Sequence, residues 1–277
     1  GFANDTLGDI AGFIETHQIV TVPSAKPPSI VETPPYLRSG LFAAMDTPGP
    51  YEHKECEAYY YVTPPEPEWN PSHTEEHLRL FNRPVMEIIT IHEAYPGHYV
   101  QFLNASRFPT RSRRILECNT NVEGWAHYAE QMMIEAGYGG NSPYLRLAQL
   151  QEALLRDCRF VVGIKLHTEG MTLEEGARFF EEKGFQEPAN AYEEARRGTY
   201  DPTYLSYTFG KLQIYKMRDD WLKANRTGDF KRFHDAFLVQ GGIPIRLLRE
   251  VMLDGDTEPT VYDADFYRNG TSLNNGE

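Results

Sequence analysis

The chain has 277 residues, of which 40% are apolar and 13% aromatic, so it can bury a substantial core and is not intrinsically disordered. Its 27 basic and 40 acidic residues leave a formal charge of −13, which argues against general nucleic-acid binding because phosphate neutralisation needs a basic surface. No apolar run approaches the roughly 20 residues of a transmembrane helix, so no membrane span is expected.

Neither a targeting segment nor a cysteine framework is predicted. The stretch from Gly1 to Asp5 has no basic or apolar part of a signal peptide and looks like a cut inside a longer protein, which leaves the localisation unknown. The three cysteines, Cys56, Cys118 and Cys158, are odd in number and contain no CxxC pair. We therefore expect small buried residues rather than a thiolate zinc site or a disulfide scaffold.

Residues 1–72 are predicted to form a proline-rich, extended region that packs on a catalytic domain. Prolines crowd the segments 22–28 and 63–67, which favours extended chain and turns. The best strand candidate is 58–63, which is aromatic and β-branched and is followed by prolines.

Helices are predicted to dominate residues 73–260, and 261–277 are expected to be a flexible tail. The fold class is therefore mainly α with a small β part. Helix-boundary signals are found at Ser72 to Glu75, Pro84, Ser142 to Pro143, Thr172 to Glu175 and Gly184. Apolar residues predict a long buried helix through Leu145, Leu147, Leu150, Leu154, Val161, Ile164 and Leu166, and further helices at 111–136, 204–224, 230–239 and 245–252.

The most informative motif is His92-Glu93 followed by His98, at the end of an apolar helix. Neutral imidazoles bind zinc well, and a carboxylate beside a ligand can accept a proton from metal-activated water. The usual HExxH spacing places two histidines one turn apart, whereas a spacing of six separates them by roughly 240° on an ideal helix. Pro96 and Gly97 interrupt the helix, and if two residues loop out there, His98 returns to the face of His92.

Glu123 is the candidate third ligand. His127 and Glu130 follow it at helical offsets of four and seven, where they can orient the ligands. Two histidines, one glutamate and an open fourth position form a common catalytic zinc site. The alternative is that Glu123 is an ordinary exposed helix carboxylate.

The segments "HEAYPGHYVQ" and "NVEGWAHYAEQM" resemble the bacterial family known as domain of unknown function 885, which is assigned to the zincin-like peptidases. The resemblance extends over roughly residues 15–253, and the six-residue histidine spacing is the family's own pattern. It implies a zincin-like helical metallopeptidase fold, with His92, His98 and Glu123 as gluzincin-type metal ligands and Glu93 as the catalytic base. Family members are usually about twice as long, so the chain resembles their C-terminal half, and the missing N-terminal half becomes an expected partner.

The resemblance points more loosely to four further cleft residues, His167, Arg197, Tyr204 and Tyr207. A zinc peptidase needs a donor that stabilises the oxyanion formed during attack, and each of these side chain types can donate. Tyr204 and Tyr207 are three apart and share a helix face. The alternatives are core tyrosines, a structural histidine and a surface ion pair.

The sequence thus predicts a hydrolase of peptide or related amide bonds that uses one Zn²⁺ per chain, with Glu93 taking the proton of the attacking water. Strand 58–63 would pair with an extended substrate as an edge strand, or else be a simple packed strand. Two alternatives remain open: a metal- or peptide-binding protein without catalysis, and a half-domain that is inactive without its missing N-terminal part.

Overall fold

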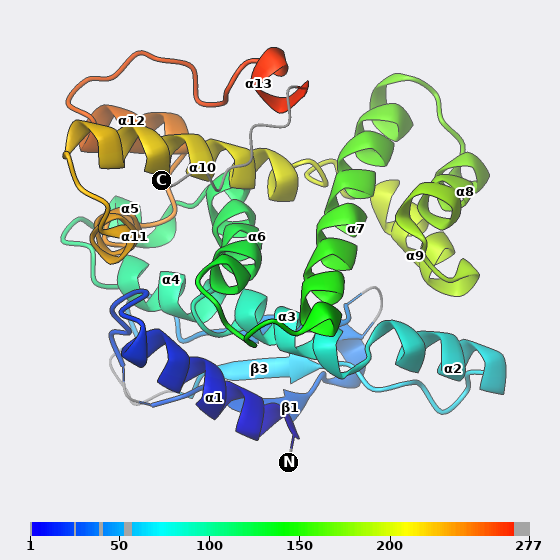
Figure 1. Ribbon diagram of the computed structural model, residues 1–277. Coiled ribbons are helices and arrows are strands. Elements are labelled where there is room, and N and C mark those ends of the chain that lie inside the picture. The colour runs from blue at the N-terminus through cyan, green and yellow to red at the C-terminus, as the bar shows by residue number, and fades with distance from the viewer. Residues whose placement is uncertain (1, 25, 39–40, 53–56, 269–277) are drawn as a thin grey trace.

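The structure is a computed structural model that describes residues 2–24, 26–38, 41–52 and 57–268 (Figure 1). Its strands are β1 (Ser29–Glu32), β2 (Ala43–Asp46) and β3 (Tyr59–Val62). Its helices are α1 (Phe2–Thr16), the 3-10 turn η1 (Pro35–Leu37), α2 (Pro71–Leu80), α3 (Arg83–Glu93), α4 (His98–Ala105), α5 (Arg111–Ile115), α6 (Asn119–Glu135), α7 (Pro143–Thr168), α8 (Leu173–Gly184), α9 (Pro188–Gly198), α10 (Ser206–Ala224), α11 (Phe230–Leu238), α12 (Ile245–Met252) and α13 (Ala264–Arg268). The predicted class, mainly α with a small β part, is confirmed. None of the helices within the described residues is both long enough and apolar enough to cross a membrane.

The sheet has the order β1-β3-β2, so the predicted strand at 58–63 is confirmed as its central strand β3. It pairs in parallel with β1, where Ser29 lies opposite Tyr59, and antiparallel with β2, where Ala43 lies opposite Val62. Both edges of β3 are therefore hydrogen-bonded, which corrects the expectation that this strand offers a free edge to a substrate. In the described sheet the edge strands are β1 and β2.

Side-chain caps begin three of the described helices where the sequence predicts a start. Asn82 and Ser142 accept hydrogen bonds from the backbone N–H three residues on, and Thr172 forms a full capping box. The start of α2 is corrected, because its cap is Asn70 and not Ser72, which lies inside the helix. A proline directly after Asn70 explains the earlier start, since proline suits the first helical turn.

Several predicted elements differ in extent. The region expected to be extended contains α1, whose residues Leu7, Ile10 and Ile14 bury one face. The helix predicted over 111–136 is broken between α5 and α6, because the N–H of Cys118 leaves the helical pattern to bond the carbonyl of Gly242.

The ends of two predictions are also corrected. The N-terminal part of α7 is not buried all round, because Leu147 and Leu150 are exposed. The segment expected to be a tail contains α13, and Tyr262 before it donates a hydrogen bond to Asp219 of α10. Residues 269–277 of the expected tail lie outside the described residues.

Of the three cysteines expected to be small buried residues, Cys158 is buried and Cys118 is half-buried. Cys56 lies outside the described residues. Burial raises the pKa of the Cys158 thiol to about 11, so it stays protonated at neutral pH.

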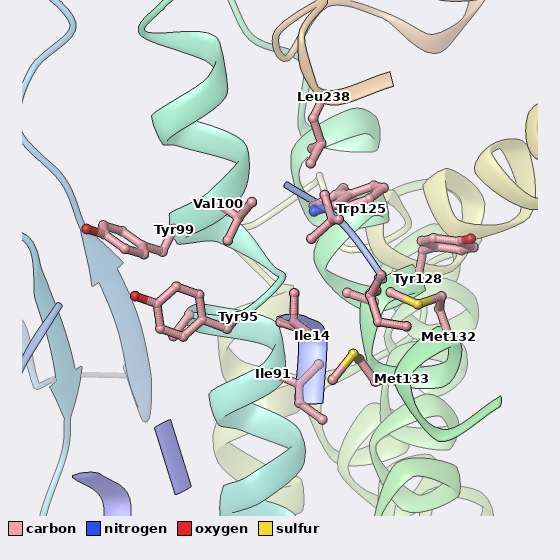
Figure 2. Packing of buried hydrophobic residues seen from close by; sticks show 14 of the residues in the cluster. Ile14, Ile91, Tyr95, Tyr99, Val100, Trp125, Tyr128, Met132, Met133 and Leu238 are labelled. Carbon is pink, nitrogen blue, oxygen red and sulfur yellow. The ribbon is translucent and has the colours of Figure 1, made fainter. Parts of the chain in front are cut away.

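Two apolar clusters hold the molecule together. The larger joins α1, α3, α4, α6, α10, α11 and α12, and Figure 2 shows some of its side chains, among them Trp125. Trp125 is fully buried, and its ring stacks on that of Phe237. The smaller joins α7, α8 and α9 around Val162, Phe180 and Tyr204. Helix α7 of the smaller cluster also packs against α3 of the larger one. A cavity between the two clusters is lined by residues of both helices.

Candidate metal centre

Helix α3 brings His92 and Glu93 into the interior at its last turn. Its residues Val85, Ile88 and Ile91 are fully buried, so the apolar face fixes the rotation of the helix. His92 and Glu93 are 4% and 8% exposed, which is unusual for two adjacent polar side chains. The helix therefore carries this polar pair into the protein and ends there.

The six-residue spacing between the histidines is accommodated by a break between two helices rather than by a bulge in one. Helix α3 ends at Glu93, four residues form a turn with a cis peptide bond before Pro96, and α4 starts at His98. Gly97 lies against α3 so closely that a Cβ there would be 1.8 Å from the carbonyl oxygen of His92. Because only glycine allows this approach, the new helix begins beside the old one and the imidazole ring centroids come to 4.8 Å.

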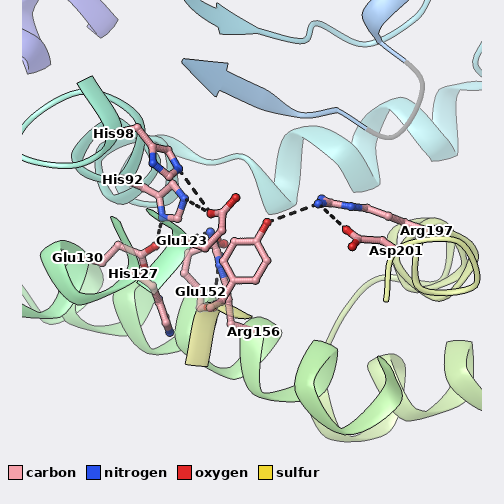
Figure 3. A network of polar contacts seen from close by, with 10 residues as sticks. His92, His98, Glu123, His127, Glu130, Glu152, Arg156, Arg197 and Asp201 are labelled. Atoms are coloured by element: carbon pink, nitrogen blue, oxygen red, sulfur yellow. Dashed lines mark hydrogen bonds and ion pairs between the residues drawn. The ribbon is translucent and has the colours of Figure 1, made fainter. Parts of the chain in front are cut away.

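Helix α6 supplies Glu123 to the same point. Its Oε2 lies 3.5 Å from the Nε2 of His92 and 3.5 Å from the Nε2 of His98 (Figure 3). The three groups can each place one ligand atom so that all lie within 4.8 Å of one another. Glycine again permits the packing, since Gly124 of α6 meets Gly210 of α10 where a Cβ would clash with backbone.

These residues fit a zinc ion. Ligands at about 2.0–2.1 Å from zinc in tetrahedral geometry are about 3.3 Å apart, close to the 3.5 Å observed on two edges of the cluster. The Oε2 of Glu123 is buried and has no hydrogen-bond partner in the described protein, so it is an acceptor that a cation would satisfy. Burial disfavours the charged carboxylate, but the two imidazoles outweigh it and hold the pKa of Glu123 well below its usual range.

Glu130 orients the first histidine from behind. Its Oε1 lies 2.6 Å from the Nδ1 of His92, and its Oε2 lies 3.1 Å from the Nδ1 of His127. With Nδ1 bonded to a carboxylate, the Nε2 of His92 faces Glu123 and is the atom available to a metal. Burial raises the pKa of Glu130, but Arg156, whose Nη2 lies 3.6 Å from Oε1, and His127 outweigh this effect. The pKa of Glu130 therefore stays well below its usual range. The predicted orienting pair is thus present, with His127 acting on His92 through Glu130.

A cavity of about 640 Å³, counting its mouth, opens beside this cluster. His92 and Glu93 line it from α3, Tyr207 lines it from α10, and Arg197 lines it from α9. The ring centroid of Tyr207 lies 6.3 Å from that of His92, and its hydroxyl lies 3.4 Å from the Nη2 of Arg197. The predicted base and two of the predicted cleft residues therefore lie in one cavity with a candidate metal ligand.

The other two predicted cleft residues do not line it. Tyr204 is fully buried in the smaller cluster, where its hydroxyl donates to the carbonyl and the carboxylate of Glu194. His167 is exposed at the end of α7, with Nε2 2.9 Å from the carbonyl oxygen of Gly198. Both fit the structural alternative left open by the sequence.

The structure adds a set of buried arginines on the far side of the cavity, which the sequence analysis did not include. Arg156 and Arg159 of α7 are 6% and 5% exposed, and Arg156 pairs with Glu152. Arg159 forms a bidentate pair with Glu194, with both N–O distances below 2.8 Å. We call Arg156, Arg159 and Arg197 the arginine wall, and His92, His98 and Glu123 the metal wall. The sequence contains a signal for the buried arginines of α7: an otherwise apolar face of this helix carries three charged residues within two turns, Glu152, Arg156 and Arg159.

Comparison with known proteins gives a family and a fold but no activity. Residues 1–252 match the model of the family described as "Bacterial protein of unknown function (DUF885)". No curated protein matches the sequence. Two solved structures are similar: a putative lipoprotein of unknown function from Shewanella oneidensis, at 32% identity with a TM-score of 0.79, and a putative lipoprotein from Colwellia psychrerythraea, at 25% identity with a TM-score of 0.75. Each comparison covers 91% of this chain but only 45% and 42% of the other, so the chain spans less than half the length of these relatives.

Proposed function

The chain belongs to the bacterial protein family of unknown function DUF885, and we propose that it is a zinc-dependent hydrolase of peptide bonds. One observation carries the proposal: the Nε2 atoms of two histidines from different helices lie 3.5 Å from the same glutamate oxygen, beside a cavity that a second glutamate lines. A structural zinc site is usually closed by a fourth protein ligand, whereas the cluster found among the described residues offers three.

The proposed mechanism assigns one task to each side chain. His92, His98 and Glu123 would hold zinc, which supplies a Lewis acid and lowers the pKa of an adjacent water. Glu93 takes the proton of the attacking water and passes it to the leaving amine. The hydroxyl of Tyr207 donates to the oxyanion, and Arg197 keeps that hydroxyl oriented by donating to its oxygen.

The edge strand beside the cavity supports a peptide as substrate. Leu41, Phe42 and Ala43 line the cavity where the chain enters β2. An extended peptide can pair with the strand edge that β3 does not occupy, which satisfies its N–H and C=O groups. We therefore place the extended substrate along β2 rather than along β3.

The proposal is tested by metal analysis and turnover on the same preparations. We expect about one zinc per chain in the wild type and none in His98→Ala. Glu93→Gln should keep zinc and lose peptide turnover by a factor on the order of 10²–10⁴. Wild-type turnover in Glu93→Gln would refute the mechanism. Zinc binding without any turnover would favour the metal-binding alternative, or a requirement for the part of the longer relatives that this chain does not cover.

A further inference from the structure

The α9 side of the cavity presents a buried donor that the protein does not use. Asn190 is 3% exposed and lines the cavity, and its Nδ2 has no hydrogen-bond partner among the described residues. Glu194 and Arg197 follow it at offsets of four and seven, so all three lie on one face of α9. An amide donor without a partner in so buried a place is costly unless a ligand satisfies it.

The arginine wall adds charged donors at the same place. The carboxylate of Glu194 accepts hydrogen bonds from Nε and Nη2 of Arg159. The Nη1 of the same guanidinium has no hydrogen-bond partner among the described residues. Arg197 donates from Nη2 to Asp201 and to Tyr207, and within the described part of the chain its Nε and Nη1 remain available to a ligand. Figure 3 shows Arg197 pointing toward the space beside Glu123 from the side opposite to the histidines.

These donors suit a carboxylate. A guanidinium and an amide N–H₂ donate and do not accept, so they select an anion. Glu194 and Asp201 already neutralise Arg159 and Arg197, so a ligand here is held by the remaining hydrogen-bond donors, and a singly charged group is less costly to bury beside them than a dianion.

The same part of the cavity offers an acceptor as well. The Oε1 of Gln186 is buried, lines the cavity and has no hydrogen-bond partner in the described residues. A C-terminal residue presents a carboxylate and, three bonds away, a peptide N–H, so it satisfies both donors and acceptor. An acidic side chain of a peptide holds its carboxylate at least one bond further from its own peptide N–H, so it matches this spacing less well. Leu80, Phe81 and Leu155 add an apolar surface for the terminal side chain.

Tyr207 sets the distance from this subsite to the metal wall. Its ring lies 6.3 Å from the ring of His92, and its hydroxyl contacts Arg197. A carboxylate bound to Arg197 is thus separated from the metal ligands by little more than the side chain of Tyr207. An extended peptide spans that distance in a few residues at most, at about 3.3–3.6 Å per residue.

We propose that Asn190, Arg159 and Arg197 bind the C-terminal carboxylate of a peptide, so that the enzyme is a carboxypeptidase that releases one residue or a short fragment from the C-terminus. This inference rests on the proposed function for its reaction, but the binding of the carboxylate is measured separately from turnover.

The test is calorimetric titration of the zinc-supplemented Glu93→Gln chain with three N-acetylated pentapeptides that end in leucine. The first has a free C-terminal carboxylate, the second is its C-terminal amide, and the third is the amide with one internal aspartate. We expect the free acid to bind at least tenfold more tightly than both amides. Arg197→Gln and Asn190→Ala, each added to Glu93→Gln, should reduce that preference to about twofold or less. Arg196→Gln is the matched control, because it removes a charge from the same helix at a residue that pairs with Glu193 and does not line this cavity.

Three outcomes would overturn the inference: equal binding of acid and amide, absence of binding by the free acid, or equal binding of the free acid and the aspartate-containing amide. The last would assign the subsite to acidic side chains. Thermal unfolding of each variant shows whether a lost preference reflects lost folding. Turnover by the wild type decides the proposed function independently: an enzyme that cleaves acid and amide peptides equally well remains a hydrolase but is not a carboxypeptidase.

Discussion

The two walls of the cavity handle buried charge in opposite ways. On the metal wall, Glu123 and the two histidines direct their polar atoms at one point, and Oε2 of Glu123 is left without a hydrogen-bond partner among the described residues. On the arginine wall, Arg159 is matched by its own carboxylate, Glu194, in a bidentate pair. A cation would complete the first arrangement, whereas in the second the charge of Arg159 is neutralised within the protein and only its Nη1 is left for a ligand. The comparison teaches that burial of charge alone does not identify a site, and that unmatched atoms do.

The largest effect should come from closing the approach that builds the metal wall. Gly97→Ala places a Cβ 1.8 Å from a backbone carbonyl oxygen, and backbone cannot move aside cheaply. Since His98 follows directly, we expect loss of zinc binding together with a lower melting temperature. Gly12→Ala in α1 is the control, because its Cβ would meet nothing within 4 Å. Equal zinc content in both variants would show that the turn does not position His98.

On the arginine wall, removing one member of a matched pair should destabilise without emptying the metal site. Arg159→Met removes the ion-pair partner of the buried Glu194, which is expected to lower the free energy of unfolding by about 3–5 kcal/mol. Adding Glu194→Met removes the orphaned charge and should restore most of that loss. Urea unfolding and zinc analysis test this, and a double variant no more stable than the single one would contradict the comparison.

His234 is a buried histidine that belongs to neither wall, and its pKa can be compared with that of the candidate metal ligand His92. Around His92, three carboxylates oppose the effect of burial. Burial is the main influence on His234 and lowers its pKa to about 4. The folded protein therefore resists a proton that the unfolded chain accepts near pH 6.5, so this contribution to stability is complete above pH 6.5 and is lost as the pH falls toward 4. The loss reaches about 3 kcal/mol, at about 1.4 kcal/mol per pH unit. Urea unfolding in the presence of a chelator should show a shallower pH dependence for His234→Gln, and unchanged slopes would exclude the effect.

The smallest effect is expected behind the metal wall. Glu130→Gln removes the carboxylate that accepts from His92 while keeping the shape of the side chain. Zinc affinity should fall by about 10- to 100-fold, as is usual for a partner that orients a ligand. Competition with a chromogenic chelator measures it, with Glu169→Gln, an exposed carboxylate beyond the end of α7, as the control. An unchanged affinity would mean that the fold alone orients His92.

Local patterns in the sequence determined much of the architecture and the candidate ligands. Asn82, Ser142 and Thr172 cap helices because a side-chain oxygen satisfies the N–H group three residues on, which needs no tertiary contact. Likewise, His92 and Glu93 stand directly after an apolar helical stripe in the sequence, which predicts their place at the end of a helix. The zinc-binding role of these residues and the enzymatic activity remain predictions.

Tertiary structure decided what depends on residues distant in the sequence. Whether a spacing of six brings His92 and His98 together depends on how Gly97 packs against the end of α3 and how Trp125 bonds the carbonyl of Pro96. Tyr204 and Tyr207 share a helix face in the sequence, yet only Tyr207 reaches the cavity, because Glu194 of another helix takes the hydroxyl of Tyr204. A charge on an apolar face can be read from a sequence, but its partner cannot, because packing between helices selects it.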